Sequence, residues 1–217
     1  MSKVAVDIDD SLYDFGGLAQ EMIIQLATKT NDKRLQKAAY STWNEWRTPN
    51  DVLEEEWQTI IDMCHQDHII RSQMPFKNAV TTLRKIFSAG NDIIYISNRS
   101  DDAYDATYEW LQTHGFPQSS SLVCTTGNKA PFIEDCRYII DDRPKTLVEF
   151  VYDYDWQRSE WDGRLNRVAF GLFCEYNRAL TDVPGIYLAP NWTLLEKYIE
   201  EKSDLLGRTP TGISSSI

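Results

Sequence analysis

The stretch Val4-Ala5-Val6-Asp7-Ile8-Asp9-Asp10-Ser11 carries the strongest evidence for the fold, because an apolar run leads directly into three carboxylates. An apolar run bounded by a turn is typical of a buried strand in a parallel sheet. Ligands of open α/β sheets bind just beyond the carboxyl ends of such strands. We therefore expect Asp7 and Asp9 to lie at the functional edge of a sheet.

Carboxylates this close in sequence repel one another and raise one another's pKa unless a cation neutralises them. A hard divalent cation with oxygen ligands satisfies this requirement, and Mg²⁺ is the ion we expect. The alternative for an isolated D-x-D-x-[ST] pattern is a strand that simply runs into an Asp-rich turn. The motif alone leaves both interpretations open.

Length and composition predict a folded, soluble chain. With 217 residues and 42% hydrophobic content, it can bury a substantial core, as one domain or as a domain with an insertion. It contains no run of about eighteen or more apolar residues, and the first predicted strand begins without a charged leader. We therefore expect a cytoplasmic protein that does not cross a membrane.

The cysteines and the net charge argue against other classes of protein. A formal charge of −11 opposes tight binding to long nucleic acid, where Lys and Arg must neutralise phosphates. It remains compatible with a small phosphate ester held through a metal ion. The four cysteines form no C-x-x-C pair, which favours reduced thiols over a disulfide framework or a zinc site; they are Cys64, Cys124, Cys136 and Cys174.

The rest of the chain alternates predicted strands and helices. Helical periodicity covers residues 16–72, which we predict to form a small helical insertion. Further strands are expected at 93–96, 122–124, 138–140, 167–173 and 185–188, and helices at 78–89, 103–113 and 192–201. This alternation predicts an α/β fold with a doubly wound, mostly parallel sheet. The segment 205–217 is predicted to be a disordered tail.

Two further strands of this pattern end in polar clusters, as the first one does. The clusters are Ser97-Asn98-Arg99 and Asp141-Asp142-Arg143, and Lys129 stands between them at a predicted loop-to-helix junction. Taken alone, a serine is usually a turn residue and a lysine is usually solvated. Their occurrence in this order is what gives each of them weight.

The order and types of these residues resemble the haloacid dehalogenase (HAD) superfamily of phosphohydrolases over residues 4–144. The resemblance rests on Asp7-Ile8-Asp9-Asp10-Ser11, Ser97, Lys129 and Asp141-Asp142. It implies a core domain of residues 1–15 and 73–204, with 16–72 as an inserted helical cap. The Asp-Asp-Arg-Pro ending and the later Phe173-Cys174-Glu175-Tyr176-Asn177-Arg178 and Asn191-Trp192 are similar to the 5′(3′)-deoxyribonucleotidase branch.

The resemblance implies a role for each motif. Asp7 would be the nucleophile that forms an aspartyl phosphate, while its other oxygen binds Mg²⁺. Asp9 would protonate the leaving alkoxide and later activate water, and its main-chain carbonyl would face the metal. Asp142 is expected to bind the metal directly, with Asp141 close by.

Further residues would contact the phosphate. Ser97 and the main-chain amide of Asn98 would donate to phosphoryl oxygens, and Lys129 would pair with the phosphate and with Asp7. For Arg143 and Arg99, two interpretations stay open: each binds the substrate phosphate or pairs with an acidic neighbour.

The sequence also offers aromatic side chains as walls for a nucleobase. Phe15 follows the first motif and is a candidate wall for a base or a sugar. In the cap, aromatics at helical spacing more often pack the cap's own core than stack on a ligand; they are Tyr40, Trp43, Trp46 and Trp57.

The resulting expectation is a Mg²⁺-dependent 5′(3′)-deoxyribonucleotidase that dephosphorylates nucleoside monophosphates. A polynucleotide 3′-phosphatase, a phosphatase of other small metabolites and a catalytically silent nucleotide-binding protein are the alternatives. The sequence leaves the oligomeric state open.

Overall fold

The computed structural model describes residues 2–40, 51–152 and 167–207, and in these a six-stranded sheet has the order β3-β2-β1-β4-β5-β6. Every pair of neighbouring strands in this sheet is parallel. The predicted α/β fold with a doubly wound sheet is thereby confirmed. The strands are β1 Lys3–Val6, β2 Asp92–Ser97, β3 Leu122–Cys124, β4 Tyr138–Ile140, β5 Val168–Leu172 and β6 Ile186–Ala189, within one residue of their predicted bounds.

β1 lies in the centre of the sheet, hydrogen-bonded to β2 on one side and to β4 on the other. Its apolar residues are buried because both faces of the sheet are covered. Side chains alternate between the faces along a strand, so Val4 and Val6 belong to one hydrophobic cluster and Ala5 belongs to the other. This explains why residues 4–6 form a continuous apolar run in the sequence.

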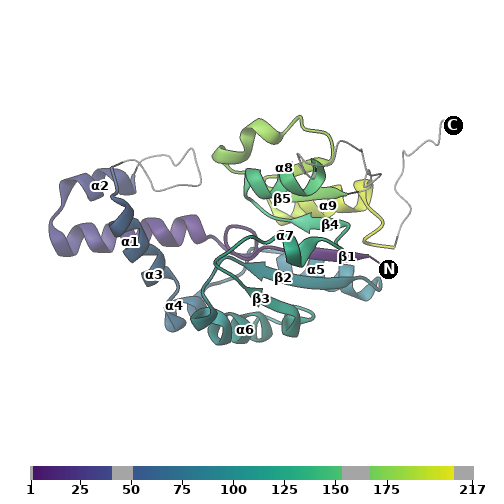
Figure 1. Ribbon diagram of the computed structural model, residues 1–217, viewed down its shortest axis with the longest axis horizontal. Coiled ribbons are helices and arrows are strands. Elements are labelled where there is room, and N and C mark those ends of the chain that lie inside the picture. The colour runs from purple at the N-terminus through teal and green to yellow at the C-terminus, as the bar shows by residue number, and fades with distance from the viewer. Residues whose placement is uncertain (1, 41–50, 153–166, 208–217) are drawn as a thin grey trace.

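Helices pack on both faces of the sheet (Figure 1). α5 Ala79–Ser88, α6 Tyr104–Thr113 and α9 Trp192–Lys202 contribute to the cluster that contains Val4 and Val6. α7 Ala130–Ile133 and α8 Pro144–Tyr152 contribute to the cluster on the opposite face. The short 3-10 helices are η1 Asp101–Ala103, η2 Ser119–Ser121 and η3 Glu175–Leu180.

The helical insertion follows β1 and comprises α1 Phe15–Thr30, α2 Lys33–Ala39, α3 Glu54–Cys64 and α4 Asp67–Ser72. α1, α2 and α3 extend away from the sheet, whereas α4 lies beside α6 (Figure 1). The side chain of Asp14 caps the start of α1 by accepting a hydrogen bond from the main-chain amide of Gly17. The bounds of the cap as a separate unit stay a prediction.

Several predicted features differ from the structure or lie outside it. α2 ends at Ala39, and Trp43 and Trp46 lie outside the described residues. The predicted tail starts too early, because Leu205 is 0% exposed and its carbonyl accepts a hydrogen bond from Asn91 Nδ2. Residues 208–217 are outside the described part of the chain. None of the helices described combines the length and apolar character needed to cross a membrane.

Candidate active site

The sheet order brings the polar strand ends together. β2, β1 and β4 are neighbours, so Ser97, Asp7 and Asp141 stand at the same edge, one at the carboxyl end of each strand. The main-chain amide of Asp7 donates to the carbonyl of Ile140 at 2.8 Å, which continues the strand pairing one residue past β1. The backbone of Asp7 is therefore fixed by the sheet.

Three carboxylates form the centre of this edge. Asp7, Asp141 and Asp142 are buried, and each offers an oxygen that lies within 4.8 Å of the oxygens of the other two. Burial raises the pKa of Asp7 to about 6, with Lys129 opposing and Asp141 and Asp9 adding to the rise. Burial, together with the charges of Asp7 and Asp141, also raises the pKa of Asp142 well above its usual value. Ionising all three carboxylates at once is therefore unfavourable.

Lys129 supplies a cation to this cluster from the residue before α7. Its ammonium lies 2.5 Å from Asp7 Oδ1 and 3.1 Å from Asp141 Oδ2, and the side chain is buried. One ammonium against three carboxylates leaves negative charge uncompensated within this group. A buried set of carboxylate oxygens with excess negative charge fits a hard divalent cation such as Mg²⁺.

Asp9 faces a different environment, built around Arg99. The Arg99 guanidinium binds both carboxylate oxygens of Asp9, with Nη2 2.7 Å from Oδ1 and Nε 3.3 Å from Oδ2. The phenol of Tyr13 donates to Asp9 Oδ1 at 2.6 Å, and Ser97 Oγ donates to Oδ2 at 3.1 Å. Burial alone would raise the pKa of Asp9, but the charges of Arg99 and His65 and these hydrogen bonds hold it well below its usual range.

The buried position of Arg99 favours one of its two predicted interpretations, pairing with an acidic neighbour. Besides Asp9, its guanidinium donates to the hydroxyl of Thr107 at 2.7 Å and to that of Tyr13 at 2.9 Å. The acidic partner is Asp9, which precedes it by 90 residues. Arg99 is therefore buried in contact with Asp9 rather than exposed at the surface.

The remaining predicted residues lie around these two centres. Ser97 is buried and directed at Asp9, whereas Asn98 is exposed. The main-chain amide of Arg143 donates to Asp141 Oδ1 at 2.8 Å, so the turn after β4 orients that carboxylate. Phe15 is buried at the start of α1, with its ring 5.6 Å from the ring of His65, which lies between α3 and α4.

Asp10 is a site residue to which sequence reasoning gave no role. It adopts a left-handed backbone conformation with φ 56° and accepts a hydrogen bond from the amide of Gly16 at 2.7 Å. Burial raises the pKa of Asp10 to about 7, although the hydrogen bond from Gly16 lowers it. The charges of Asp9, Asp14 and Asp7 add to the rise. An Asp at a turn position that needs a positive φ was the available signal.

Tyr176 and Asn177 of η3 also contact this cluster, although sequence reasoning assigned no role to either. The phenol of Tyr176 donates to Asp142 Oδ2, and Asn177 Nδ2 donates to the carbonyl of Asp142 at 3.0 Å. The sequence of their segment is similar to a nucleotidase branch, but its position beside β4 follows from the strand order β4-β5.

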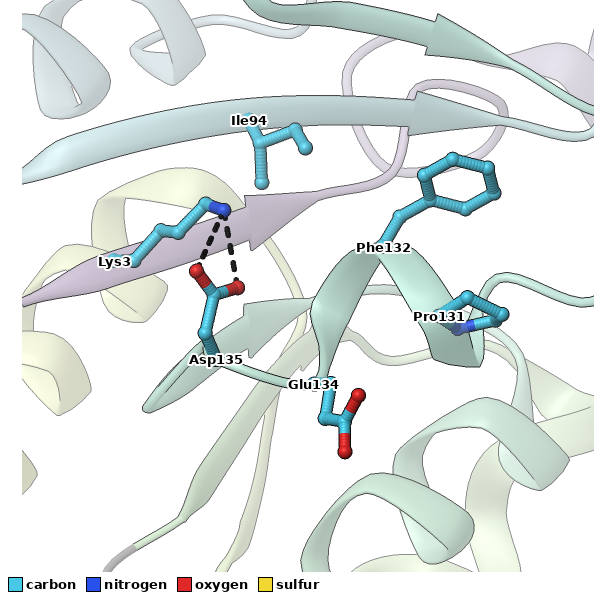
Figure 2. A pocket seen from close by; sticks show the side chains of 6 residues that line it. All are labelled: Lys3, Ile94, Pro131, Phe132, Glu134 and Asp135. Carbon is cyan, nitrogen blue, oxygen red and sulfur yellow. Dashed lines mark hydrogen bonds and ion pairs between the residues drawn. The ribbon is translucent and has the colours of Figure 1, made fainter.

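A surface hollow of about 500 Å³ lies elsewhere, at the start of β1 (Figure 2). Lys3 points into it and pairs with Asp135 at 3.0 Å. The other lining residues are Ile94, Pro131, Phe132 and Glu134. Because Lys3 stands at the opposite end of β1 from Asp7, this hollow is not part of the carboxylate site.

Comparison with known protein families shows which family this chain belongs to. Residues 1–152 match the family described as "5' nucleotidase, deoxy (Pyrimidine), cytosolic type C protein". The chain belongs to this family. A relative from Bacillus cereus named "Putative nucleotidase" is 26% identical over 160 residues, which cover 69% of this chain and 80% of the relative. This nucleotidase-family member is an HAD phosphohydrolase and thus a phosphoric monoester hydrolase.

Solved structures agree on the fold. A HAD family hydrolase from Deinococcus radiodurans, solved with bound phosphate and sodium, has a TM-score of 0.56 at 12% identity and covers 97% of this chain and 98% of its own. A HAD hydrolase of family IA, variant 3, from Entamoeba histolytica has a TM-score of 0.58 at 11% identity, with 96% and 100% covered. At these identities the likeness shows the fold alone.

Proposed function

We propose that this enzyme is a Mg²⁺-dependent nucleotidase that releases phosphate from nucleoside monophosphates, deoxynucleotides in particular, through an aspartyl-phosphate intermediate. The observation that carries the proposal is the buried group of Asp7, Asp141, Asp142 and Lys129, directly beside the Arg99-bound Asp9. The deoxy and pyrimidine specificity named in the family description supports the substrate class. The word "cytosolic" in that description supports the predicted cytoplasmic location.

Asp7 is the proposed nucleophile. With a pKa of about 6, it is ionised at neutral pH, and Lys129 stabilises the anion. One carboxylate oxygen attacks phosphorus, the ester P–O bond breaks, and the leaving alkoxide takes a proton. Water then attacks the phosphorus of the aspartyl phosphate, which returns Asp7 as a carboxylate and releases inorganic phosphate.

The metal would be held by Asp7, Asp142 and the main-chain carbonyl of Asp9, with Asp141 beside them paired to Lys129. When bound, Mg²⁺ would neutralise charge on the phosphate oxygens. Lys129 would contribute a second positive charge toward the phosphate.

Asp9 is the proposed acid and base. Its lowered pKa and its ion pair with Arg99 leave it anionic in this structure, which is the form needed to take a proton from water. Donating a proton to the leaving group requires a protonated Asp9, whose ion pair with Arg99 is then lost. The proposed acid step thus depends on weakening that pair.

The substrate would be held by residues around both centres. Ser97, the amide of Asn98 and the guanidinium of Arg143 are the proposed phosphate contacts besides Lys129. Phe15, at the junction of core and cap, is the proposed wall for the base or the sugar.

The test is phosphate release from 5′- and 3′-nucleoside monophosphates, sugar phosphates and a 3′-phosphorylated oligonucleotide, with Mg²⁺ or EDTA. We expect Mg²⁺-dependent turnover of mononucleotides that Asp7→Asn abolishes. Asp135→Asn, which removes an exposed carboxylate paired with Lys3, is the matched control and should retain activity. Full activity of Asp7→Asn would refute the covalent mechanism, and preference for the oligonucleotide would refute the substrate class.

A further inference from the structure

Asp142 is held by two consecutive residues of η3. The phenol of Tyr176 donates to its Oδ2, and the side-chain amide of Asn177 donates to its main-chain carbonyl at 3.0 Å. Asp142 and Asn177 are buried, and Tyr176 is partly buried. The carboxylate and the backbone of this residue are thus both bound by one segment.

That segment is itself anchored to the sheet. Asn177 Nδ2 also donates to the carbonyl of Leu172 at 2.8 Å, and Asn177 Oδ1 accepts from the amide of Cys174 at 2.9 Å. The amide of Phe173 donates to the carbonyl of Ala189 at 2.8 Å. Asn177 therefore ties the end of β4 to the end of β5, and it fixes the position from which Tyr176 reaches Asp142.

We infer that Tyr176 is a positioning residue for the metal, which fixes the plane of the Asp142 carboxylate so that it faces Asp7 and Asp141. This inference rests on the proposed function, since it assumes a divalent cation at the three carboxylates. A carboxylate with one oxygen held by a rigid phenol loses little further rotational freedom when it binds a cation. Partners that orient metal ligands in this way typically contribute about 10- to 100-fold to metal affinity.

The experiment compares Tyr176→Phe with Tyr138→Phe in the full chain. Tyr138 is a matched control because its phenol also donates to a carboxylate, Asp204 Oδ1, at 2.7 Å, and that carboxylate is not part of the cluster. Mg²⁺ affinity is measured directly by calorimetric titration, and Mn²⁺ affinity by electron paramagnetic resonance. Melting temperatures of the metal-free proteins are recorded in parallel.

We expect Tyr176→Phe to bind Mg²⁺ and Mn²⁺ about 10- to 100-fold more weakly than the wild type. Tyr138→Phe should bind both metals like the wild type. The KM for nucleotide at saturating Mg²⁺ should change little in Tyr176→Phe, because the phenol contacts the metal ligand rather than the substrate.

The possible failures are distinguishable. If the wild type binds neither metal, the proposed function is overturned, and the inference falls with it. If the wild type binds metal and Tyr176→Phe binds it equally well, the inference alone is overturned. Equal losses of affinity in Tyr176→Phe and Tyr138→Phe would also overturn it, because they would show a general effect on the fold.

Discussion

The buried ion pair between Arg99 and Asp9 gives a stability prediction that the structure defines closely. The side chains are 1% and 12% exposed, and Arg99 contacts both carboxylate oxygens. We expect Arg99→Met to lower the free energy of unfolding by about 3–5 kcal/mol, because removing one partner of a buried pair leaves an uncompensated charge. Methionine fills the space of the arginine stem, so lost packing contributes little.

The loss of stability should come from Asp9, because the other two partners of Arg99 have further hydrogen bonds of their own. Thr107 Oγ1 also donates to the carbonyl of Ala103 at 2.7 Å, and Tyr13, which donates to Asp9 at 2.6 Å, is unchanged by the substitution. For a chain of this size, about 3–5 kcal/mol corresponds to a decrease of about 6–20 °C in melting temperature.

The pH dependence of the variant follows from the same pair. In the wild type the folded-state pKa of Asp9 lies below 3.8, so its contribution to stability is constant from pH 5 to pH 8 and is lost only in strong acid. Without Arg99, burial raises this pKa above 3.8, and the folded state binds more protons than the unfolded state. The stability of Arg99→Met should therefore rise as the pH falls, by up to about 1.4 kcal/mol per pH unit.

The assay is urea unfolding in EDTA at pH 5 to pH 8 for the wild type, Arg99→Met, Asp9→Asn and the double variant. Subtracting the wild-type curve removes the titration of Asp7, which is common to the wild type and Arg99→Met. The double variant should be more stable than Arg99→Met, because no buried charge is left unpaired. A loss below about 1 kcal/mol in Arg99→Met, or no recovery in the double variant, would refute the reasoning.

Three further predictions concern the metal cluster and its supports. In EDTA, Asp7 alone should lower wild-type stability by about 3 kcal/mol between pH 4 and pH 7, because its folded-state pKa is about 6 and its usual value is 3.8, and the raised pKa values of Asp10 and Asp142 should add to this fall. Thermal unfolding with excess Mg²⁺ should show a weaker decline. Gly171→Ala should cost about 1–3 kcal/mol in urea unfolding, because its Cβ would stand 2.4 Å from the carbonyl oxygen of Asp141; an unchanged unfolding midpoint would contradict this. Trp192→Phe should cost about 1–3 kcal/mol by the same assay, since the buried carbonyl of Ser11 would lose the indole N–H at 2.9 Å; stability equal to the wild type would show that this bond contributes nothing.

The sequence was sufficient to predict the strand ends because their signals are local. Buried parallel strands are short apolar runs, and each of the three ends in a polar cluster that is visible without any knowledge of distant contacts. Once the strands are placed in a doubly wound sheet, topology brings Asp7, Ser97 and Asp141 to one edge. Lys129 lies directly before α7, and its ammonium reaches Asp7 and Asp141 at that edge.

The partners of these residues could not be predicted in the same way. Arg99 and Asp9 are 90 residues apart, and the choice between phosphate and carboxylate as the partner of Arg99 depends on how deeply its side chain is buried. Tyr176 reaches Asp142 only because β5 pairs with β4, and no local pattern in η3 encodes that contact. Charge pairing across the fold is a property of the packed structure rather than of any segment.

Asp7 and Asp9 are two residues apart, yet the fold shifts their pKa values in opposite directions. Asp7 is buried, and the charges of Asp141 and Asp9 add to the effect of burial against that of Lys129, whereas Asp9 is turned toward Arg99, Tyr13 and Ser97. Environments that separate the pKa values of two neighbouring carboxylates are a common way of giving them different chemical roles. Both carboxylates have a cation within the protein, but Lys129 only partly offsets the effect of burial on the pKa of Asp7, whereas Arg99 and the hydrogen bonds around Asp9 outweigh it. The same arginine that stabilises the buried carboxylate therefore also sets how readily Asp9 can hold the proton that the proposed first step requires.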